Sequence, residues 1–184
     1  SHTEKRGFRK VSFKPIDVSP YAEDSLFRMG SKIVIMSATI MDHEIFTRTL
    51  GIKKEDSCFI SLSSPFPVKN RPVMFSPVGS MSAKNIEMTL PKIAIAVREI
   101  LDHHKNEKGI IHCKTYKIAN YIKNTLKDRR FLIHDSSNRD EILDKHIKSK
   151  SPTVLLSPSM TEGVDLQGES SRFQIICKVP YPYL

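Results

Sequence analysis

Three groups of polar residues stand directly after short apolar runs, the place where a parallel sheet presents its chemistry. They are Ser37-Ala38-Thr39 after 32–36, Lys114-Thr115-Tyr116 after 109–113, and 157–168 after 153–157. Hydroxyls, a lysine and a helix start are groups that hold phosphates. Each group also has a purely structural explanation: a helix cap, a helix start, and a turn with its glycine at positive φ.

The elements that must position these groups alternate between strand and helix through the second half of the chain. Apolar runs predict strands at 71–75, 109–113, 130–134, 153–157 and 173–179. Helical periodicity predicts helices at 91–104 with Thr89 as N-cap, at 115–126, and from Asn138, where Glu141 would complete a capping box. This alternation predicts parallel βαβ units, an α/β fold with helices on both faces of the sheet.

The first third of the chain is more mixed. We expect a strand at 32–36, a helix after Asp42 that ends at Gly51, and a strand at 58–62. The stretch 61–72 is rich in serine and proline, so it predicts a linker and the domain boundary. We therefore expect domains at 1–66 and 67–184, with residues 1–3 compatible with a tag remnant.

The order and spacing of the motifs are more specific than any one of them. IVIMSATI, SSPFPVKNRP, KGIIHCKTYKIANYI and LLSPSMTEGVDLQGESSRFQIICKVPYP follow one another along the chain. This set resembles the C-terminal part of XPD/DinG-type superfamily 2 DNA helicases, over roughly residues 10–184. The resemblance implies a RecA-like second motor domain at 67–184, preceded by the tail of the first motor domain with its motif III-like strand.

The resemblance implies a role for each matching residue. Glu162, Gly163 and Asp165 would lie in the nucleotide cleft, where Asp165 would accept a hydrogen bond from the nucleotide sugar. Ser37, Ala38 and Thr39 would couple nucleotide state to strand binding. The residues that would contact single-stranded DNA are Lys114, Thr115, Tyr116, Ser157, Thr161 and Arg139.

Simpler roles stay open for three of these side chains. Tyr116 at a helix start is equally explained by packing, and Arg139 by solvation of a helix start. Glu162 would serve equally well to tie down its own loop.

The sequence also departs from a complete helicase. It contains no GxxxxGK[ST] loop and no DExH or DEAD tetrapeptide, and the arginine-bearing motif VI would follow 179–182, where only two more residues remain. ATP and Mg²⁺ are therefore expected in the parent protein and not on this chain, and the family's iron–sulfur cluster, where present, outside it. We expect an ATPase-inactive fragment of an ATP-dependent DNA helicase whose partners are single-stranded DNA and the first motor domain.

Composition agrees with a phosphate-rich partner and excludes several classes of protein. The net charge is +9, and the hydrophobic fraction is 39% with no apolar run long enough to span a bilayer. Three widely spaced cysteines and no CxxC pair indicate buried free thiols in a reducing compartment, cytoplasmic or nucleoid-associated, with neither a metal site nor a membrane partner.

Two other functions remain as alternatives. A non-catalytic helicase-like module would bind nucleic acid or a protein without turning over ATP. A small-molecule enzyme on a Rossmann-like sheet is less favoured, because the sequence has no GxGxxG fingerprint.

Overall fold

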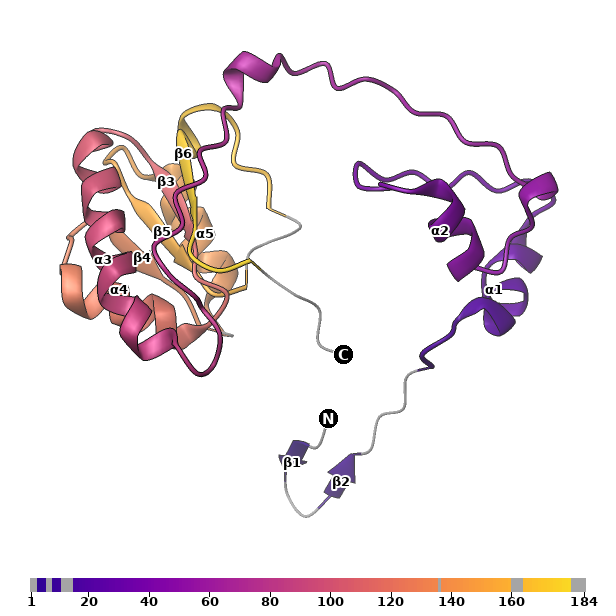
Figure 1. Cartoon of the computed structure of the whole chain (residues 1–184), viewed down its shortest axis with the longest axis horizontal. Helices are drawn as coiled ribbons and strands as arrows, with labels where there is room; N and C mark the ends of the chain where they lie inside the picture. Colours follow the sequence, from indigo (N-terminus) through magenta and orange to yellow (C-terminus); the bar gives the residue numbers. More distant parts are fainter. Residues whose placement is uncertain (1–2, 6–7, 11–14, 136, 160–163, 180–184) are drawn as a thin grey trace. The chain divides into compact units, whose positions relative to one another are not determined.

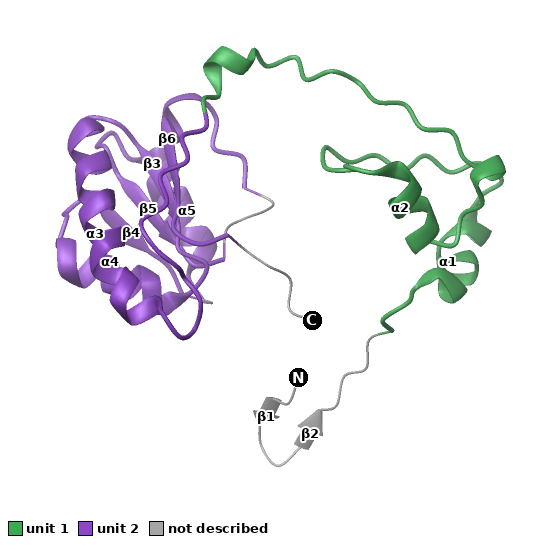
Figure 2. Ribbon diagram, viewed as in Figure 1, with its two compact units in different colours: residues 1–72 green, residues 73–184 purple. Residues whose placement is uncertain are grey.

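The computed structural model describes all residues except 1–2, 6–7, 11–14, 136, 160–163 and 180–184. The described chain forms two compact units, residues 1–72 and residues 73–184 (Figure 2). The compact units meet at 72/73. The expected boundary between helicase domains at 66/67 is a separate statement and stays a prediction. Each unit is described separately below.

The second unit is built around a four-stranded parallel sheet. Its strands are β3 (Gly109–His112), β4 (Phe131–Ile133), β5 (Val154–Ser157) and β6 (Phe173–Ile176), in the order β4-β5-β3-β6. Each strand pairs in parallel with its neighbours. This confirms the predicted parallel sheet, a RecA-like α/β arrangement.

Helices cover both faces of this sheet (Figure 1). Helices α3 (Ile86–His103) and α4 (Tyr116–Leu126) pack on one face, where Val97, Ile111 and Ile122 belong to the main apolar cluster. Helix α5 (Arg139–Lys148) packs on the other face through Ile142 and Leu143, against Ile110 and Leu155. Because both faces are buried, the central strands are continuously apolar, as in other doubly covered sheets.

The predicted start of α3 was wrong, whereas α5 begins directly after Asn138 as predicted but without the predicted capping box. Helix α3 begins at Ile86, five residues before Pro91, so Thr89 is not an N-cap; its hydroxyl donates to the carbonyl oxygens of Ser80 (2.8 Å) and Asn85 (3.1 Å). The side chain of Asn138 does not cap α5 either. Its Oδ1 accepts the backbone N–H of Asp135 (2.8 Å), so it stabilises the preceding turn instead.

The first unit contains short elements only. They are β1 (Thr3–Lys5) paired antiparallel with β2 (Phe8–Lys10), α1 (Ser19–Ser25), α2 (His43–Thr49), and the 3₁₀ turns η1 (Phe27–Met29), η2 (Lys54–Asp56) and η3 (Val68–Asn70); a fourth turn, η4 (Gly168–Ser170), lies in the second unit. Helix α2 is capped as predicted, since Asp42 accepts the Ile45 N–H (3.0 Å) and Gly51 adopts a φ of 70°.

The predicted strands at 32–36, 58–62 and 71–75 are absent from the structure. These segments have no regular structure, and side chains such as Val34 (84% exposed), Ile60 (77%) and Met74 (90%) are largely solvent-accessible. The prediction failed because an apolar run forms a strand only when a neighbouring strand supplies hydrogen bonds.

Candidate functional site

The carboxyl ends of β3 and β5 lie side by side. His112 is paired with Ser157 in the parallel register, and the N–H of Cys113 donates to the carbonyl oxygen of Ser157 (2.8 Å). The turn after β3 and the segment after β5 therefore leave the sheet next to each other, as predicted. We call this end of the sheet the carboxyl edge, defined by residues 113–116, 134–135, 137–139 and 157–159.

The turn between β3 and α4 has an unusual backbone. Lys114 adopts a φ of 63°, a left-handed conformation that costs a non-glycine residue about 1–2 kcal/mol. Thr115 is the N-cap of α4, and its Oγ1 accepts the N–H of Ile118 (3.3 Å). The left-handed residue turns the chain sharply from the strand into the helix, so the positive N-terminus of α4 lies at the carboxyl edge.

The aromatic ring of Tyr116 has two surroundings. One side packs edge-on against the ring of His134, with centroids 6.3 Å apart and an interplanar angle of 70°. The side chain is nevertheless 43% exposed. The packing role considered for Tyr116 is thus present in the structure, and the exposed part leaves area for contact with another molecule.

His134 was missed by the sequence analysis. It follows β4, is only 3% exposed, and its Nδ1–H donates to the carbonyl oxygen of Asp135 (3.0 Å). Its Nε2 is buried and has no hydrogen-bond partner among the described residues. The signal was available, because His134 ends the apolar run RFLIH at the same edge as the other polar groups.

The edge near β4 is acidic. Asp135 accepts hydrogen bonds from the Ser137 hydroxyl (2.6 Å) and backbone N–H (2.7 Å), and these bonds lower the pKa of the Asp135 carboxyl. The carboxylate is exposed, so it repels phosphates here. Arg139, the first residue of α5, is half-buried four residues further on.

The segment after β5 is partly described. Ser157 is 1% exposed, so its hydroxyl does not reach the surface. Thr161, Glu162 and Gly163 lie outside the described residues. Beyond them, Val164 and Leu166 pack against the cluster on the α5 face.

Asp165 lies between these two packed side chains. Its carboxylate is exposed, and Oδ2 accepts a hydrogen bond from the Gln167 side-chain amide (2.8 Å). An exposed carboxylate that is held in place can accept a hydrogen bond from a hydroxyl group.

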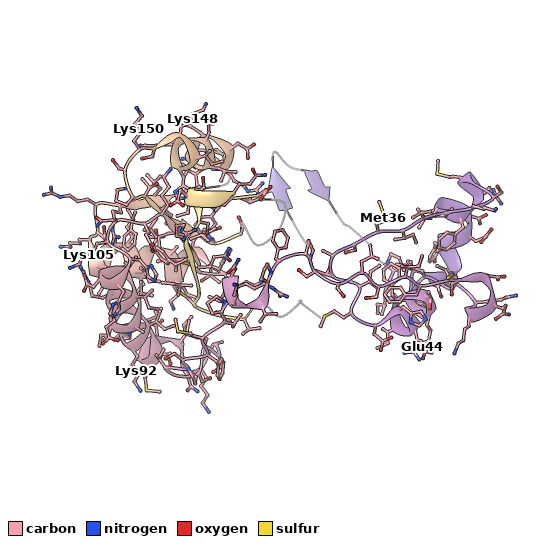
Figure 3. All side chains as sticks on the ribbon, turned by 90° about the horizontal axis from the view of Figure 1, so that it is seen from above. Met36, Glu44, Lys92, Lys105, Lys148 and Lys150 are labelled. Atoms are coloured by element: carbon pink, nitrogen blue, oxygen red, sulfur yellow. The ribbon has the colours of Figure 1, made fainter. Side chains whose placement is uncertain are left out.

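Ser37, Ala38 and Thr39 belong to the first unit and are exposed. The Ser37 hydroxyl oxygen accepts the Thr39 N–H (3.1 Å), so the three residues form a local turn. Many basic groups lie elsewhere: Lys92, Lys105, Lys148 and Lys150 extend from the surface of the second unit (Figure 3). Lys105 and Lys150 precede β3 and β5, so they lie toward the amino edge of the sheet, opposite Lys114.

The sheet order, the two helical layers and the loops at one edge define an α/β domain of the RecA-like class. Residues 98–184 match the protein family described as "Helicase C-terminal domain". The chain is also 24% identical to the ATP-dependent DNA helicase DinG of Photobacterium profundum over 186 aligned positions. That alignment covers 93% of this chain and 26% of the relative, so the chain spans about a quarter of the relative's length.

Residues 98–184 are therefore similar to helicase C-terminal domains, and the chain as a whole is similar to part of a DinG helicase. Within the described residues, the helices are too short or too polar to cross a membrane.

Proposed function

We propose that residues 73–184 act as the second motor domain of an ATP-dependent DNA helicase and hold single-stranded DNA at the carboxyl edge. The observation that carries this proposal is the side-by-side ending of β3 and β5. It brings the Lys114-Thr115 turn and the start of the motif at 157–168 to one place.

Each group at the turn after β3 has a physical role in this proposal. Lys114 neutralises a backbone phosphate, and the N-terminus of α4 accepts a second phosphate through its first-turn N–H groups. The exposed part of Tyr116 offers a base a surface to stack on. Arg139 and Thr161 are proposed as further contacts along the strand.

The nucleotide belongs to the whole helicase in this proposal. Asp165, with Glu162 and Gly163, would hold the sugar of ATP. ATP and Mg²⁺ supply the phosphoryl-transfer chemistry when they are bound. The 184 residues contain neither a phosphate-binding loop nor an acidic tetrapeptide, so we propose that this chain alone does not hydrolyse ATP.

We further propose that the apolar run at 32–36 in the first unit is covered by the rest of the first motor domain. Val34 and Met36 are 84% and 86% exposed within a continuous apolar run, which is the composition of a strand covered on both faces. Ser37-Ala38-Thr39, directly after it, would then reach the nucleotide cleft. Cys58, Cys113 and Cys177 are free thiols, so we also propose an intracellular, reducing location.

Fluorescence anisotropy with a labelled oligonucleotide across a salt series tests the proposal. One motor domain offers roughly 3–4 phosphate contacts, so log K should fall with log salt at a slope of about −2 to −3 for a single strand. Affinity should be no better than roughly micromolar at physiological salt. Absence of binding at low salt, or a stronger affinity for duplex than for single strand, would contradict the proposal.

A further inference from the structure

Two of the three cysteines lie opposite each other on neighbouring strands. Cys113 directly follows β3 and Cys177 directly follows β6. The register pairs His112 with Ile176, and the N–H of Cys177 donates to the carbonyl oxygen of His112 (3.0 Å). The strand pairing thus continues for one residue, which places Cys113 and Cys177 side by side.

Both thiols also face the same side of the sheet. Cys113 belongs to the apolar cluster under α3 and α4, together with Ile111, and Cys177 packs against that cluster, together with Ile175. The Cys113 Sγ–H donates to the carbonyl oxygen of Ile111 (3.4 Å), and the Cys177 side chain is close enough to raise the pKa of the Cys113 thiol. Neighbouring strands lie about 4.8 Å apart, within the Cα separation of about 4.4–6.8 Å that a disulfide spans.

We propose that Cys113 and Cys177 form a reversible disulfide that joins the carboxyl ends of β3 and β6. The oxidant is a small-molecule disulfide such as oxidised glutathione. Both thiols are free in the structure, so the proposed bond is a modification of the reduced protein.

Burial sets the order of the two steps. Cys113 is 0% exposed, and its neighbour Cys177 together with burial raises the pKa of the Cys113 thiol, so Cys113 does not attack first. Cys177 is only partly buried. Its thiolate attacks the small disulfide, which forms a mixed disulfide at Cys177 and releases one small thiol.

Cys113 completes the exchange. It loses its proton and attacks the Cys177 sulfur of the mixed disulfide, which releases the second small thiol. Two protein thiols are oxidised, one small disulfide is reduced to two thiols, and no other reactant is needed. Because Cys113 is buried, the second step is the slower one, and the mixed disulfide accumulates transiently.

The bond would affect the proposed nucleic-acid contact, because Cys113 immediately precedes Lys114. It would also anchor β6, a strand whose one neighbour among the described residues is β3. The loop that it closes includes α4, β4, α5 and β5, so most of the sheet would be constrained in the unfolded state.

The experiment uses the full chain with Cys58→Ser, because Cys58 is exposed and would cross-link separate molecules. The protein is incubated with oxidised glutathione, and thiol alkylation, intact mass and peptide mapping follow the reaction. We expect a glutathione adduct that decays to a product lacking two hydrogens, with Cys113 linked to Cys177. Its thermal midpoint should rise by about 10 °C and return to the reduced value with dithiothreitol.

The matched control is Cys113→Ala in the same background, which should retain the adduct at Cys177. Three results would overturn the proposal. They are a stable glutathione adduct on the Cys58→Ser protein, two thiols that can still be alkylated after prolonged oxidation, and a disulfide that joins two chains. Nucleic-acid binding is not a readout here, so this result is independent of the proposed function.

Discussion

At the scale of single residues, Lys114 combines a backbone cost with a placement that favours function. A left-handed lysine is less stable than a glycine at the same φ, by about 1–2 kcal/mol before the entropic cost of glycine is counted. Strain of this kind persists where the surrounding structure enforces it, often at a binding site. The left-handed conformation therefore motivates a test of the Lys114 side chain in binding.

Substitutions of Lys114 distinguish the effect of backbone strain on stability from the effect of the side-chain charge on DNA binding. We expect Lys114→Gly to be more stable than Lys114→Ala by up to about 1 kcal/mol, because only glycine adopts a φ of 63° without strain. Both variants should lose affinity for single-stranded DNA to the same extent, because both lack the ammonium group. Urea unfolding and anisotropy measure the two effects. A variant that binds as well as the parent protein would show that the lysine has no binding role.

His146 predicts a second effect at this scale, on the pH dependence of stability. The ring is 0% exposed; Nε2–H donates to the carbonyl oxygen of Ser170 (2.8 Å), and Nδ1 accepts from the Thr153 hydroxyl (2.8 Å). Burial and the charge of Lys108 lower the pKa of His146. The folded state thus holds the neutral ring, and its stabilising contribution is complete above the unfolded-state pKa of about 6.5.

Below that pH the unfolded state binds a proton that the folded state does not. The free energy of unfolding should therefore fall as pH decreases from 7 to 5, by at most about 1.4 kcal/mol per pH unit for this one proton. Burial also lowers the pKa of His112. In the unsubstituted chain, His112 and His146 therefore both contribute to the pH dependence of the free energy of unfolding. His146→Gln should reduce the slope in urea titrations followed by circular dichroism; an identical slope would contradict this assignment.

At the scale of elements, the packing of β6 on β3 depends on a residue without a side chain. A Cβ on Gly109 would overlap the ring of Phe173, which is 8% exposed and stacked on His104 with centroids 4.5 Å apart. The ring therefore has no room to move away. Gly109 is the start of β3, so the clash would act on the pairing of the two strands.

We expect Gly109→Ala to destabilise the protein by about 1–3 kcal/mol, the usual cost of overpacking a core. Gly30→Ala is a suitable control, because the nearest atom to its Cβ would be the Lys32 carbonyl oxygen at 3.4 Å. Thermal unfolding compares the two variants. Equal midpoints for both would show that the Phe173 ring repacks freely.

The elements of the second unit were largely predictable from the sequence, whereas in the first unit helix α2 matched its prediction and the predicted strands did not. The runs 109–113 and 153–157 are strands because each has a neighbour that satisfies its backbone groups. The run 32–36 has the same composition and no such neighbour among the described residues. An apolar run predicts that a segment will be buried, but it does not predict which strand will pair with that segment.

The start of α3 was missed for a different reason. Proline is common at the first helical position, so the sequence pattern predicts Pro91 as the beginning of the helix. In the structure the Thr89 hydroxyl bridges to Asn85 and Ser80, which stabilises one more turn before the proline. At the site, Thr115 and the shared edge followed from strand order, whereas the burial of Ser157 and His134 depended on packing that a sequence pattern does not contain.

At the scale of the whole molecule, the proposed function assigns some binding groups to this chain and others to the rest of the helicase. In the proposal, this chain supplies the nucleic-acid edge and a contact to the sugar of ATP, and the groups that bind the phosphates of ATP belong to the rest of the helicase. We therefore expect no ATP turnover by the 184-residue protein, with or without single-stranded DNA. A coupled phosphate-release assay measures it. Turnover that co-purifies with the protein and disappears in Asp165→Ala would contradict the expectation.

The central claim is that single-stranded DNA binds at the carboxyl edge, and a comparison of two lysines tests it most directly. Lys114→Gln removes a charge at that edge, and Lys150→Gln removes one toward the amino edge, where the side chain is exposed. Anisotropy across a salt series should show that Lys114→Gln weakens binding and makes the log–log slope shallower by about 0.7, the loss of one phosphate contact. Lys150→Gln should leave both values unchanged. Equal changes in the two variants would mean that binding is diffuse charge attraction without a defined track.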